Sequence, residues 1–186
     1  MRLETPSSDR AAQASLRPAV PGDLAAVQSI YGFYVARSTA TFEETLPDLD
    51  ELAQRLNAIV GRGLPYLVAE AAGGIAGFAY AAPFRQRSAY RYTVEDSIYV
   101  RDGMDGLGIG RALLGAVIDA CEALDYRQMI AVIGDSANAR SIRLHGRLGF
   151  RPAGTLFAAG FKFGRWIDSV YMQRPLGEGD RSQPRD

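Results

Sequence analysis

The sequence predicts an α/β protein in which a mixed, mostly antiparallel central sheet carries helices on both faces. Two observations lead to this class. Segments with apolar residues at helical spacing alternate with apolar runs of strand length, and glycine-rich turns separate them. The 186 residues are enough for one domain with a substantial core. We expect that domain over 14–176, with flexible tails over 1–13 and 177–186.

Eleven elements are expected within the domain, and helical or alternating apolar spacing predicts most of them. They are a strand over 15–20, helices over 24–34 and 48–60, strands over 64–71, 75–82 and 90–100, a helix over 109–124, a strand over 129–133, a helix over 138–147 and a final pair of strands over 150–157 and 161–173. Gly73 and Gly74 predict a hairpin turn between the second and third strands. Asp96 interrupts the apolar series of the central strand, and a bulge there would splay that strand from its neighbour.

Composition excludes several classes of function. Lys plus Arg and Asp plus Glu both number 21, so the formal net charge of zero argues against nucleic acid as an obligatory partner. Cys121 lies on an apolar helix stripe and is expected in the core. Because the sequence has a single histidine, His145, no metal site is expected. No apolar run is long enough for a bilayer and no hydrophobic signal segment begins the chain, so we expect a cytoplasmic protein without a membrane partner.

A glycine-rich turn joins the central strand to the helix that starts at Ile109. Glycines let a ligand approach the backbone, and the unpaired N–H groups at a helix start favour an anion, most often a phosphate. A P-loop is excluded because Arg111 follows Gly110 where lysine is required, and the spacing is wrong for a dinucleotide fingerprint. A Gly108-Ile-Gly110 turn that opens an amphipathic helix fits the pyrophosphate of coenzyme A.

Three further features remain open from the residues alone. Glu95 and Asp96 are adjacent acids in a central strand, which indicates either a salt-bridged structure or catalysis. Arg85 and Arg87 are either solvated charges, the reading that we favour at this point, or a clamp for a carboxylate. Phe42 is equally compatible with a hydrophobic staple for the next helix and with a wall of a substrate pocket.

Several blocks in matching order resemble the GNAT family of N-acetyltransferases over about 16–176. The central strand, the Gly-x-Gly turn, Asn138 with Ser141, and the closing 148–150 carry this resemblance. Within the family, the chain resembles the phosphinothricin and methionine sulfone acetyltransferase group. The blocks that carry this closer match are 39–42, 83–87, 90–95, 144–145 and 160–168.

The resemblance implies transfer of the acetyl group of acetyl-CoA to the α-amino group of methionine sulfone, methionine sulfoximine or phosphinothricin type amino acids, by a homodimer. It implies that Glu95 is the catalytic base. His145 is then a proton donor, a relay or a structural residue, and it works with Glu95 directly or through water. The backbone N–H near Ile98 would stabilise the thioester oxygen.

The resemblance also implies the binding residues, and it makes the carboxylate clamp the better reading of the two arginines. Residues expected to bind the coenzyme are Ile98, Tyr99, Val100, Gly106, Leu107, Gly108, Ile109, Gly110, Arg111, Asn138 and Ser141. Residues expected to bind the amino acid are Phe42, Arg85, Arg87, Tyr92, Thr93 and Lys162. Lys162 is expected to reach the site from the partner subunit.

The phosphate turn departs from the family at two positions. Asp105 stands where the family usually has Arg or Gln, and Asp102 stands where it usually has proline. Either Asp105 caps the helix and points away, or the coenzyme binds more weakly, and Arg111 is a candidate for compensating charge. Two rival functions stay open, which are acetylation of another amine or a protein N-terminus and non-catalytic sensing of acyl-CoA. Arg85 and Arg87 argue against a polyamine acceptor.

Overall fold

The computed structural model describes residues 14–71 and 73–184, so the predicted tail over 1–13 lies outside the described residues. Two short 3-10 helices, Pro21–Asp23 and Ser88–Tyr90, accompany the main elements. Those elements are β1 (Ser15–Pro18), α1 (Leu24–Arg37), α2 (Leu49–Val60), β2 (Tyr66–Ala71), β3 (Gly74–Pro83), β4 (Thr93–Val100), α3 (Ile109–Ala123), β5 (Gln128–Gly134), α4 (Ala139–Arg147), β6 (Arg151–Lys162) and β7 (Arg165–Pro175).

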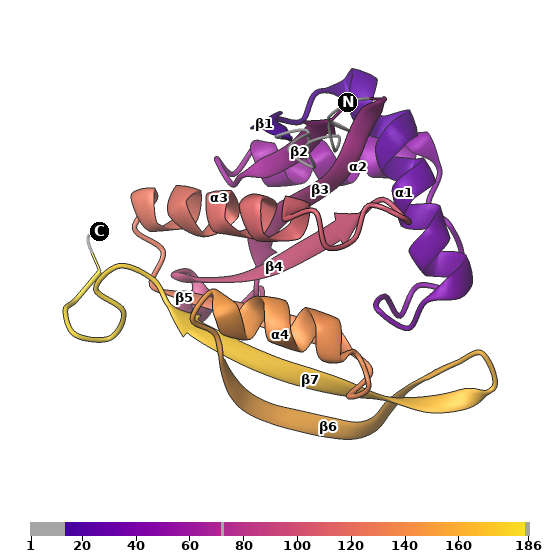
Figure 1. Ribbon diagram of the computed structural model, residues 1–186. Coiled ribbons are helices and arrows are strands. Elements are labelled where there is room, and N and C mark those ends of the chain that lie inside the picture. The colour runs from indigo at the N-terminus through magenta and orange to yellow at the C-terminus, as the bar shows by residue number, and fades with distance from the viewer. Residues whose placement is uncertain (1–13, 72, 185–186) are drawn as a thin grey trace, which may run out of the picture.

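The described strands form one sheet in the order β1-β2-β3-β4-β5-β7-β6 (Figure 1). Within the described part of the chain, β4 and β5 are the one parallel pair, and α3 is the crossover that joins them. The mixed, mostly antiparallel sheet predicted from the sequence is therefore confirmed. None of the helices in residues 14–71 and 73–184 has the length and apolar character needed to cross a membrane.

Helices cover both faces of the sheet, as predicted. Gly77 of β3 faces α3, since a Cβ there would lie 3.1 Å from the side chain of Leu113. The next residue along β3, Phe78, faces the other way and stacks on Tyr99, which packs edge-on against Tyr31 of α1. Because neighbouring strand residues point to opposite faces, α3 and α1 lie on opposite sides. Cys121 of α3 is buried, as the apolar stripe predicted.

The central strand differs from its prediction at two points. It begins at Thr93 rather than residue 90, because the chain before it closes a 3-10 turn in which the Tyr90 N–H donates to the Arg87 carbonyl at 2.9 Å. The expected bulge near Asp96 is wrong, since β3 and β4 pair in unbroken register over the whole of β4 from Val94 to Val100. Asp96 keeps the inward parity of the apolar residues and is buried.

The final hairpin turns later than predicted. Its turn is formed by Phe163 and Gly164, with φ of 51° and 73°, rather than by the break expected at 158–160. Two successive left-handed residues match the twist of a two-residue hairpin, which explains the glycine at the second position. The interval 158–160 is instead an irregularity within β6, where Ala158 has a φ of 52°.

The segment after β7 lies against Arg127. The guanidinium of this residue donates to the Ser182 hydroxyl at 3.0 Å and to the Gln183 carbonyl at 3.1 Å. Leu176, where the segment begins, is fully buried. These contacts attach the described end of the chain to Arg127. The predicted flexibility of 177–186 stays a prediction, and so does the cytoplasmic location.

Candidate active site

The sheet opens between its two parallel strands. Pairing of β4 with β5 runs from Thr93, opposite Gln128, to Asp96, opposite Ala131, and ends there. Beyond that point a cavity of about 60 Å³ lies between the strands, with α4 at its side. Its lining residues include Ser97, Ile98, Tyr99, Val132, Ile133, Ser141 and His145. The splay predicted at Asp96 is therefore present, and it arises without a bulge.

A larger cavity of about 470 Å³ lies beside this opening, within the size range of small-molecule sites. Ile98, Asn138 and Ser141 line both cavities, so the two lie next to each other. The end of α1, the loop over 38–40, the end of β4 and the start of α4 form the walls. Asn138 is the N-cap of α4, and its side chain accepts a hydrogen bond from the Ser141 N–H at 3.2 Å.

Lys162 holds one wall in place. Its ammonium is buried and donates to the carbonyls of Ser38 and Thr41, both at 2.9 Å, and to that of Tyr34 at 3.5 Å. Desolvation lowers its pKa from the ordinary value. Three carbonyls of its own chain thus engage the ammonium, and the expectation that Lys162 binds substrate from a partner subunit stays a prediction.

The same loop is fixed to the end of β5. Asp135, at a φ of 74°, accepts a hydrogen bond from the Thr39 hydroxyl at 3.0 Å and pairs with Arg165. That pairing with Arg165 holds the pKa of Asp135 below its usual range. The loop passes so close to Gly134 that the Thr39 carbonyl leaves no room for a Cβ. Residue 134 must therefore be glycine for the wall to reach the opening.

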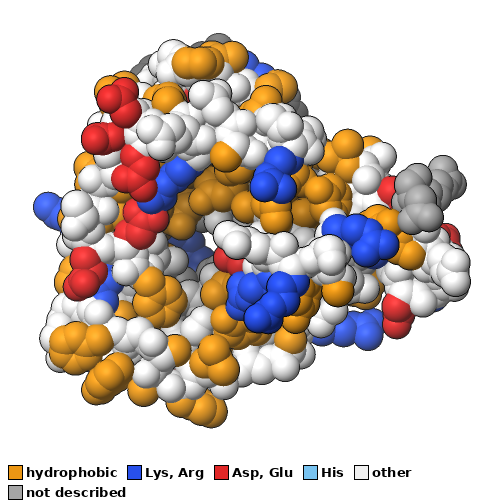
Figure 2. All heavy atoms as spheres, turned by 180° about the vertical axis from the view of Figure 1, so that it is seen from behind, with side chains coloured by type: hydrophobic (Ala, Val, Ile, Leu, Met, Phe, Trp, Pro, Cys, Tyr) orange, Lys and Arg blue, Asp and Glu red, His pale blue; other side chains and the backbone are white. Residues whose placement is uncertain are grey.

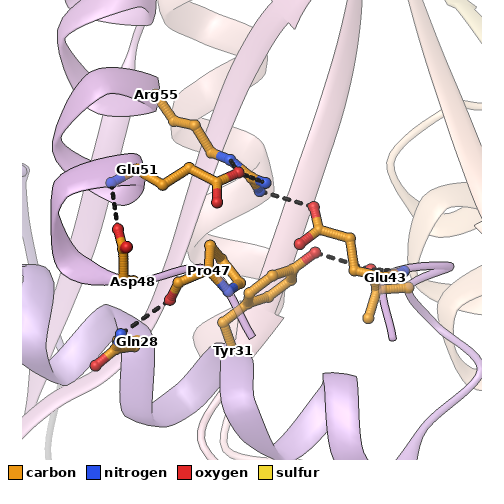
Figure 3. Close-up of polar contacts among 8 residues, drawn as sticks. Gln28, Tyr31, Glu43, Pro47, Asp48, Glu51 and Arg55 are labelled. Atoms are coloured by element: carbon orange, nitrogen blue, oxygen red, sulfur yellow. Dashed lines mark hydrogen bonds and ion pairs between the residues drawn. The ribbon is translucent and has the colours of Figure 1, made fainter. Parts of the chain in front are cut away.

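The chain continues from this loop through 41–47 to α2. Contacts with α1 and α2 hold that segment in place (Figure 3). Tyr31 shares a hydrogen bond of 2.8 Å with the Thr41 hydroxyl, and Gln28 donates to the Pro47 carbonyl at 2.9 Å. Arg55 pairs with Glu43 at 2.7 Å. Phe42, held between these contacts, lies against Gly160 of β6, where its ring leaves no space for a Cβ.

Asp96 and His145 form a buried pair at the point where the strands separate. The Nε2 of His145 lies 3.0 Å from Asp96 Oδ2, and its Nδ1 lies 2.8 Å from the Ser141 carbonyl and 3.3 Å from the Ser141 hydroxyl. The structure does not bring His145 and Glu95 together, because neighbouring residues of β4 point to opposite faces and His145 meets Asp96.

The contacts of His145 determine its protonation. Burial lowers its pKa, but the hydrogen bond and charge of Asp96, together with the Ser141 carbonyl, outweigh burial and raise it above the ordinary value. A carbonyl only accepts, so Nδ1 carries a proton, and a carboxylate favours a second proton on Nε2. The arrangement thus favours the imidazolium form of His145 beside the small cavity, opposite the carboxyl group of Asp96.

Glu95 is half-buried on the face of the sheet that α1 covers. Desolvation raises its pKa, the neighbouring charge of Asp96 raises it further, and Arg85 opposes them. Figure 2 shows the molecule from behind, with a hollow that has acidic side chains along one rim and Lys or Arg side chains on the other. A half-buried carboxylate with a raised pKa is a better proton acceptor than a fully solvated one.

The predicted substrate residues occupy different places. Arg85 and Arg87 line a surface pocket together with Tyr90, and the Arg85 guanidinium stacks on Phe84 at 4.2 Å. Thr93 is the half-buried first residue of β4. The ring of Tyr92 lies under the Arg91 guanidinium at 4.5 Å, and its carbonyl accepts hydrogen bonds from the start of β5. The structure therefore groups Arg85 and Arg87 but does not collect all of these residues in one pocket.

The glycine turn lies beside the larger cavity. Gly106 and Gly108 have φ values of 79° and 81°, and Gly108 is the N-cap of α3. Ile109 is buried and Gly110 packs close to Leu144, whereas Leu107 and Arg111 are exposed. Their roles toward a coenzyme stay predictions.

Asp105 reaches the cavity from this turn and pairs with Arg140 of α4 through both carboxylate oxygens. It does not cap α3, because no side chain accepts a bond at that N-terminus. Arg140 is the cation that pairs with Asp105, and the compensating role expected of Arg111 toward a coenzyme stays a prediction. Sequence reasoning missed Arg140, since only the fold brings α4 to the turn.

Tyr34 was also missed. Its hydroxyl donates to the Val100 carbonyl at 2.7 Å and accepts from the Val100 N–H at 3.2 Å. The backbone of Val100, which was expected to bind the coenzyme, is thus already paired, although its side chain lines the larger cavity. Tyr34 is the last residue of the helix predicted over 24–34, and helical spacing carries no sign of this contact.

Comparison with known proteins decides the family. A model described as an acetyltransferase (GNAT) domain matches residues 16–171. The chain belongs to the GNAT acetyltransferase family.

Individual relatives narrow the relationship. The chain is 51% identical over 162 residues to a phosphinothricin N-acetyltransferase of Alcaligenes faecalis, covering 87% of this chain and 82% of that protein. It is 42% identical over 172 residues to an L-methionine sulfoximine/L-methionine sulfone acetyltransferase of Pseudomonas paraeruginosa, covering 92% and 99%. A phosphinothricin acetyltransferase of Sinorhizobium meliloti, solved with AcCoA, superposes with a TM-score of 0.90 at 49% identity, covering 94% of each chain.

These relationships confirm the predicted GNAT fold and the predicted resemblance to this group. The chain is an acetyl-CoA-dependent acyltransferase, as the sequence predicted. Its residues fit that co-substrate in one respect that the structure displays directly. The larger cavity adjoins the opening of the sheet and is lined both by Asp105 of the glycine turn and by Ile98 of β4.

The raised pKa of His145 can be tested directly, because it is the only histidine in the sequence. We predict that Asp96→Asn lowers the His145 pKa, since burial then acts without the opposing carboxylate. A pH titration of the imidazole by NMR measures the shift. A wild-type pKa at or below about 6.5 would contradict the ion pair.

The same pair has a consequence for stability. Because the folded pKa of His145 is raised, its contribution is present below about pH 6.5 and is lost as the pH rises through the folded value. Urea unfolding at a series of pH values across this range measures the free energy of unfolding. This free energy should fall as the pH rises in the wild type, and it should fall less in Asp96→Asn.

Proposed function

We propose that this chain transfers the acetyl group of acetyl-CoA to the α-amino group of a small amino acid of the methionine sulfone, methionine sulfoximine or phosphinothricin type. The observation that carries the proposal is the position of Glu95, a half-buried carboxylate with a raised pKa one residue before the sheet opens. Relatives named for these three acceptors agree with it.

The amine must lose a proton before it attacks, and Glu95 takes that proton. The bound coenzyme supplies the acetyl thioester. A new N–C bond forms as the C–S bond breaks, and the backbone N–H near Ile98 stabilises the thioester oxygen as it gains charge. The unpaired stretch of β4 beyond Asp96 supports this role, because it lines the opening beside β5.

The thiolate that leaves needs a proton, and His145 supplies it by relay. Its Nδ1 lies 3.3 Å from the Ser141 hydroxyl, which lines both cavities. Ser141 passes its hydroxyl proton to the sulfur and receives one from Nδ1, while Asp96 holds the imidazole in orientation. His145 therefore acts through Ser141 rather than with Glu95.

Arg85 and Arg87 bind the carboxylate of the amino acid in this proposal. They line one pocket, and the guanidinium of Arg85 is near enough to Glu95 to lower its pKa. Guanidinium groups bind carboxylates through paired hydrogen bonds, which would place the α-amino group toward Glu95. We propose Phe42, Tyr92, Thr93 and Lys162 as further residues of the acceptor site, as the family resemblance implies.

We also propose a homodimer whose interface includes the β6–β7 hairpin. β6 is an edge strand of the sheet, and the hairpin exposes large apolar side chains. Phe157 is 80% exposed and Trp166 is 65% exposed. An apolar edge of this kind is costly to leave in water, and a second copy offers a matching one.

The base assignment predicts that Glu95→Gln lowers kcat for L-methionine sulfone by about 100- to 10,000-fold, with the KM for acetyl-CoA little changed. Free-thiol release from acetyl-CoA measures turnover. In the wild type, kcat/KM should fall as the pH drops through the raised pKa of Glu95, because only the carboxylate accepts the proton.

Full turnover in Glu95→Gln would exclude Glu95 as the base. The assay panel should include phosphinothricin, a peptide with a free N-terminal alanine and a polyamine. Activity confined to the peptide or the polyamine would overturn the proposed acceptor, and coenzyme binding without turnover on any acceptor would favour the sensor.

The carboxylate clamp predicts that Arg85→Gln and Arg87→Gln each raise the KM for methionine sulfone by about tenfold, the loss of one charged hydrogen bond. Methionine sulfone amide, which lacks the carboxylate, is the matched acceptor. It should react poorly with the wild type and no worse with the variants. Equal losses on both acceptors would contradict the clamp.

The dimer proposal predicts a mass of two chains in light scattering. Phe157→Glu combined with Trp166→Glu should give monomers, because the charges would be buried at the interface. Leu124→Glu, which changes an exposed apolar residue at the end of α3, is the control and should stay dimeric. A monomeric wild type at micromolar concentration would refute the interface.

A further inference from the structure

The larger cavity has a charge that does not suit its proposed ligand. Four charged side chains line it, and three of them, Asp102, Asp105 and Asp135, are acidic. Coenzyme A carries a pyrophosphate and a further phosphate, so it would meet a wall with a formal excess of negative charge. Repulsion between like charges opposes binding unless a cation intervenes.

Two of these acids are balanced by different means. Asp135 is compensated by Arg165, which lies outside the cavity lining, and by hydrogen bonds from the Thr39 hydroxyl and the Ala137 N–H. Asp105 is compensated by Arg140, the one cation among the residues that line the cavity. Among the described residues, the cavity therefore has a single cationic side chain, and a carboxylate engages it.

The Asp105–Arg140 pair is also the link between two walls. Asp105 belongs to the turn that precedes α3, and Arg140 belongs to the first turn of α4. Their side chains are 38% and 57% exposed, so water solvates both partners. An ion pair in this setting is weakly stabilising and exchanges partners readily.

We propose that Arg140 binds the phosphates of coenzyme A and that Asp105 competes for the same guanidinium. A guanidinium forms paired hydrogen bonds with phosphate as it does with carboxylate, so one partner can replace the other. Coenzyme binding then moves Arg140 from Asp105 to a phosphate and leaves Asp105 to water. This proposal rests on the proposed coenzyme site and adds a residue that sets its affinity.

The two members of the pair should act in opposite directions. Arg140 contributes attraction to the phosphates, whereas Asp105 contributes repulsion and occupies the cation. If the Asp105–Arg140 ion pair only held the two walls together, loss of either partner would weaken coenzyme binding. The sign of the Asp105 effect therefore distinguishes competition from support.

The experiment is isothermal titration of the intact protein with coenzyme A and with pantetheine, which lacks the phosphates. Arg140→Gln should raise the Kd for coenzyme A about tenfold, and Asp105→Asn should lower it about fivefold, on the scale of one solvated charge interaction. Neither substitution should change the Kd for pantetheine. Arg143→Gln, an exposed arginine on the same helix, is the matched control and should bind like the wild type.

Weaker binding of coenzyme A by Asp105→Asn, or unchanged binding by Arg140→Gln, would overturn the proposal. Thermal melts of the variants establish that they fold. Failure of the wild type to bind coenzyme A at all would instead refute the proposed function. If the wild type binds coenzyme A and turns over normally, and Arg140→Gln binds coenzyme A with the same Kd, only the role of Arg140 is refuted.

Discussion

β4 and β5 stop pairing after Asp96 and Ala131, and the features of both cavities follow from that divergence. Parallel strands that stay paired leave no room for a ligand between them. Here the strands separate at a buried ion pair, and α4 packs into the resulting angle through His145. The same event leaves the backbone of β4 beyond Asp96 without a neighbouring strand on that side. Glu95, one residue earlier and on the other face, is placed at the edge of this opening.

Keeping the opening accessible requires that nearby segments be fixed without filling it. The loop over 38–42 is held by the buried ammonium of Lys162, by Asp135 and by contacts from α1 and α2. These are hydrogen bonds to backbone carbonyls and hydroxyl groups, which specify direction as well as distance. Apolar packing alone would let the loop collapse toward β5. Gly134 and Gly160 make the close approaches possible because each lacks a side chain where the loop passes.

Charge is distributed between the two sides of the sheet in a way that suits a bisubstrate reaction. On the side of Glu95, Arg85 is close enough to influence the carboxylate that acts as base in our proposal. On the side of α3 and α4, a neutral overall pair of Asp96 and His145 stores a proton away from water. Burial favours this neutrality, because an unbalanced charge in such a place would be expensive. Reactions that take a proton on one face and give one on the other need this separation.

The sequence by itself determined the fold class, most elements and the family, because these depend on apolar periodicity, on turn glycines and on short motifs in order. It placed Glu95, His145 and the glycine turn on the correct elements. It did not determine that His145 pairs with Asp96 rather than with Glu95, that Lys162 is bound within its own chain, or that Arg140 compensates Asp105. Those pairings join residues 35 to 128 positions apart, as between Asp105 and Arg140 or Tyr34 and Lys162. Only the packing of α4 and β6 against the rest of the sheet decided them, because local spacing carries no information about which distant side chain will complete a buried charge.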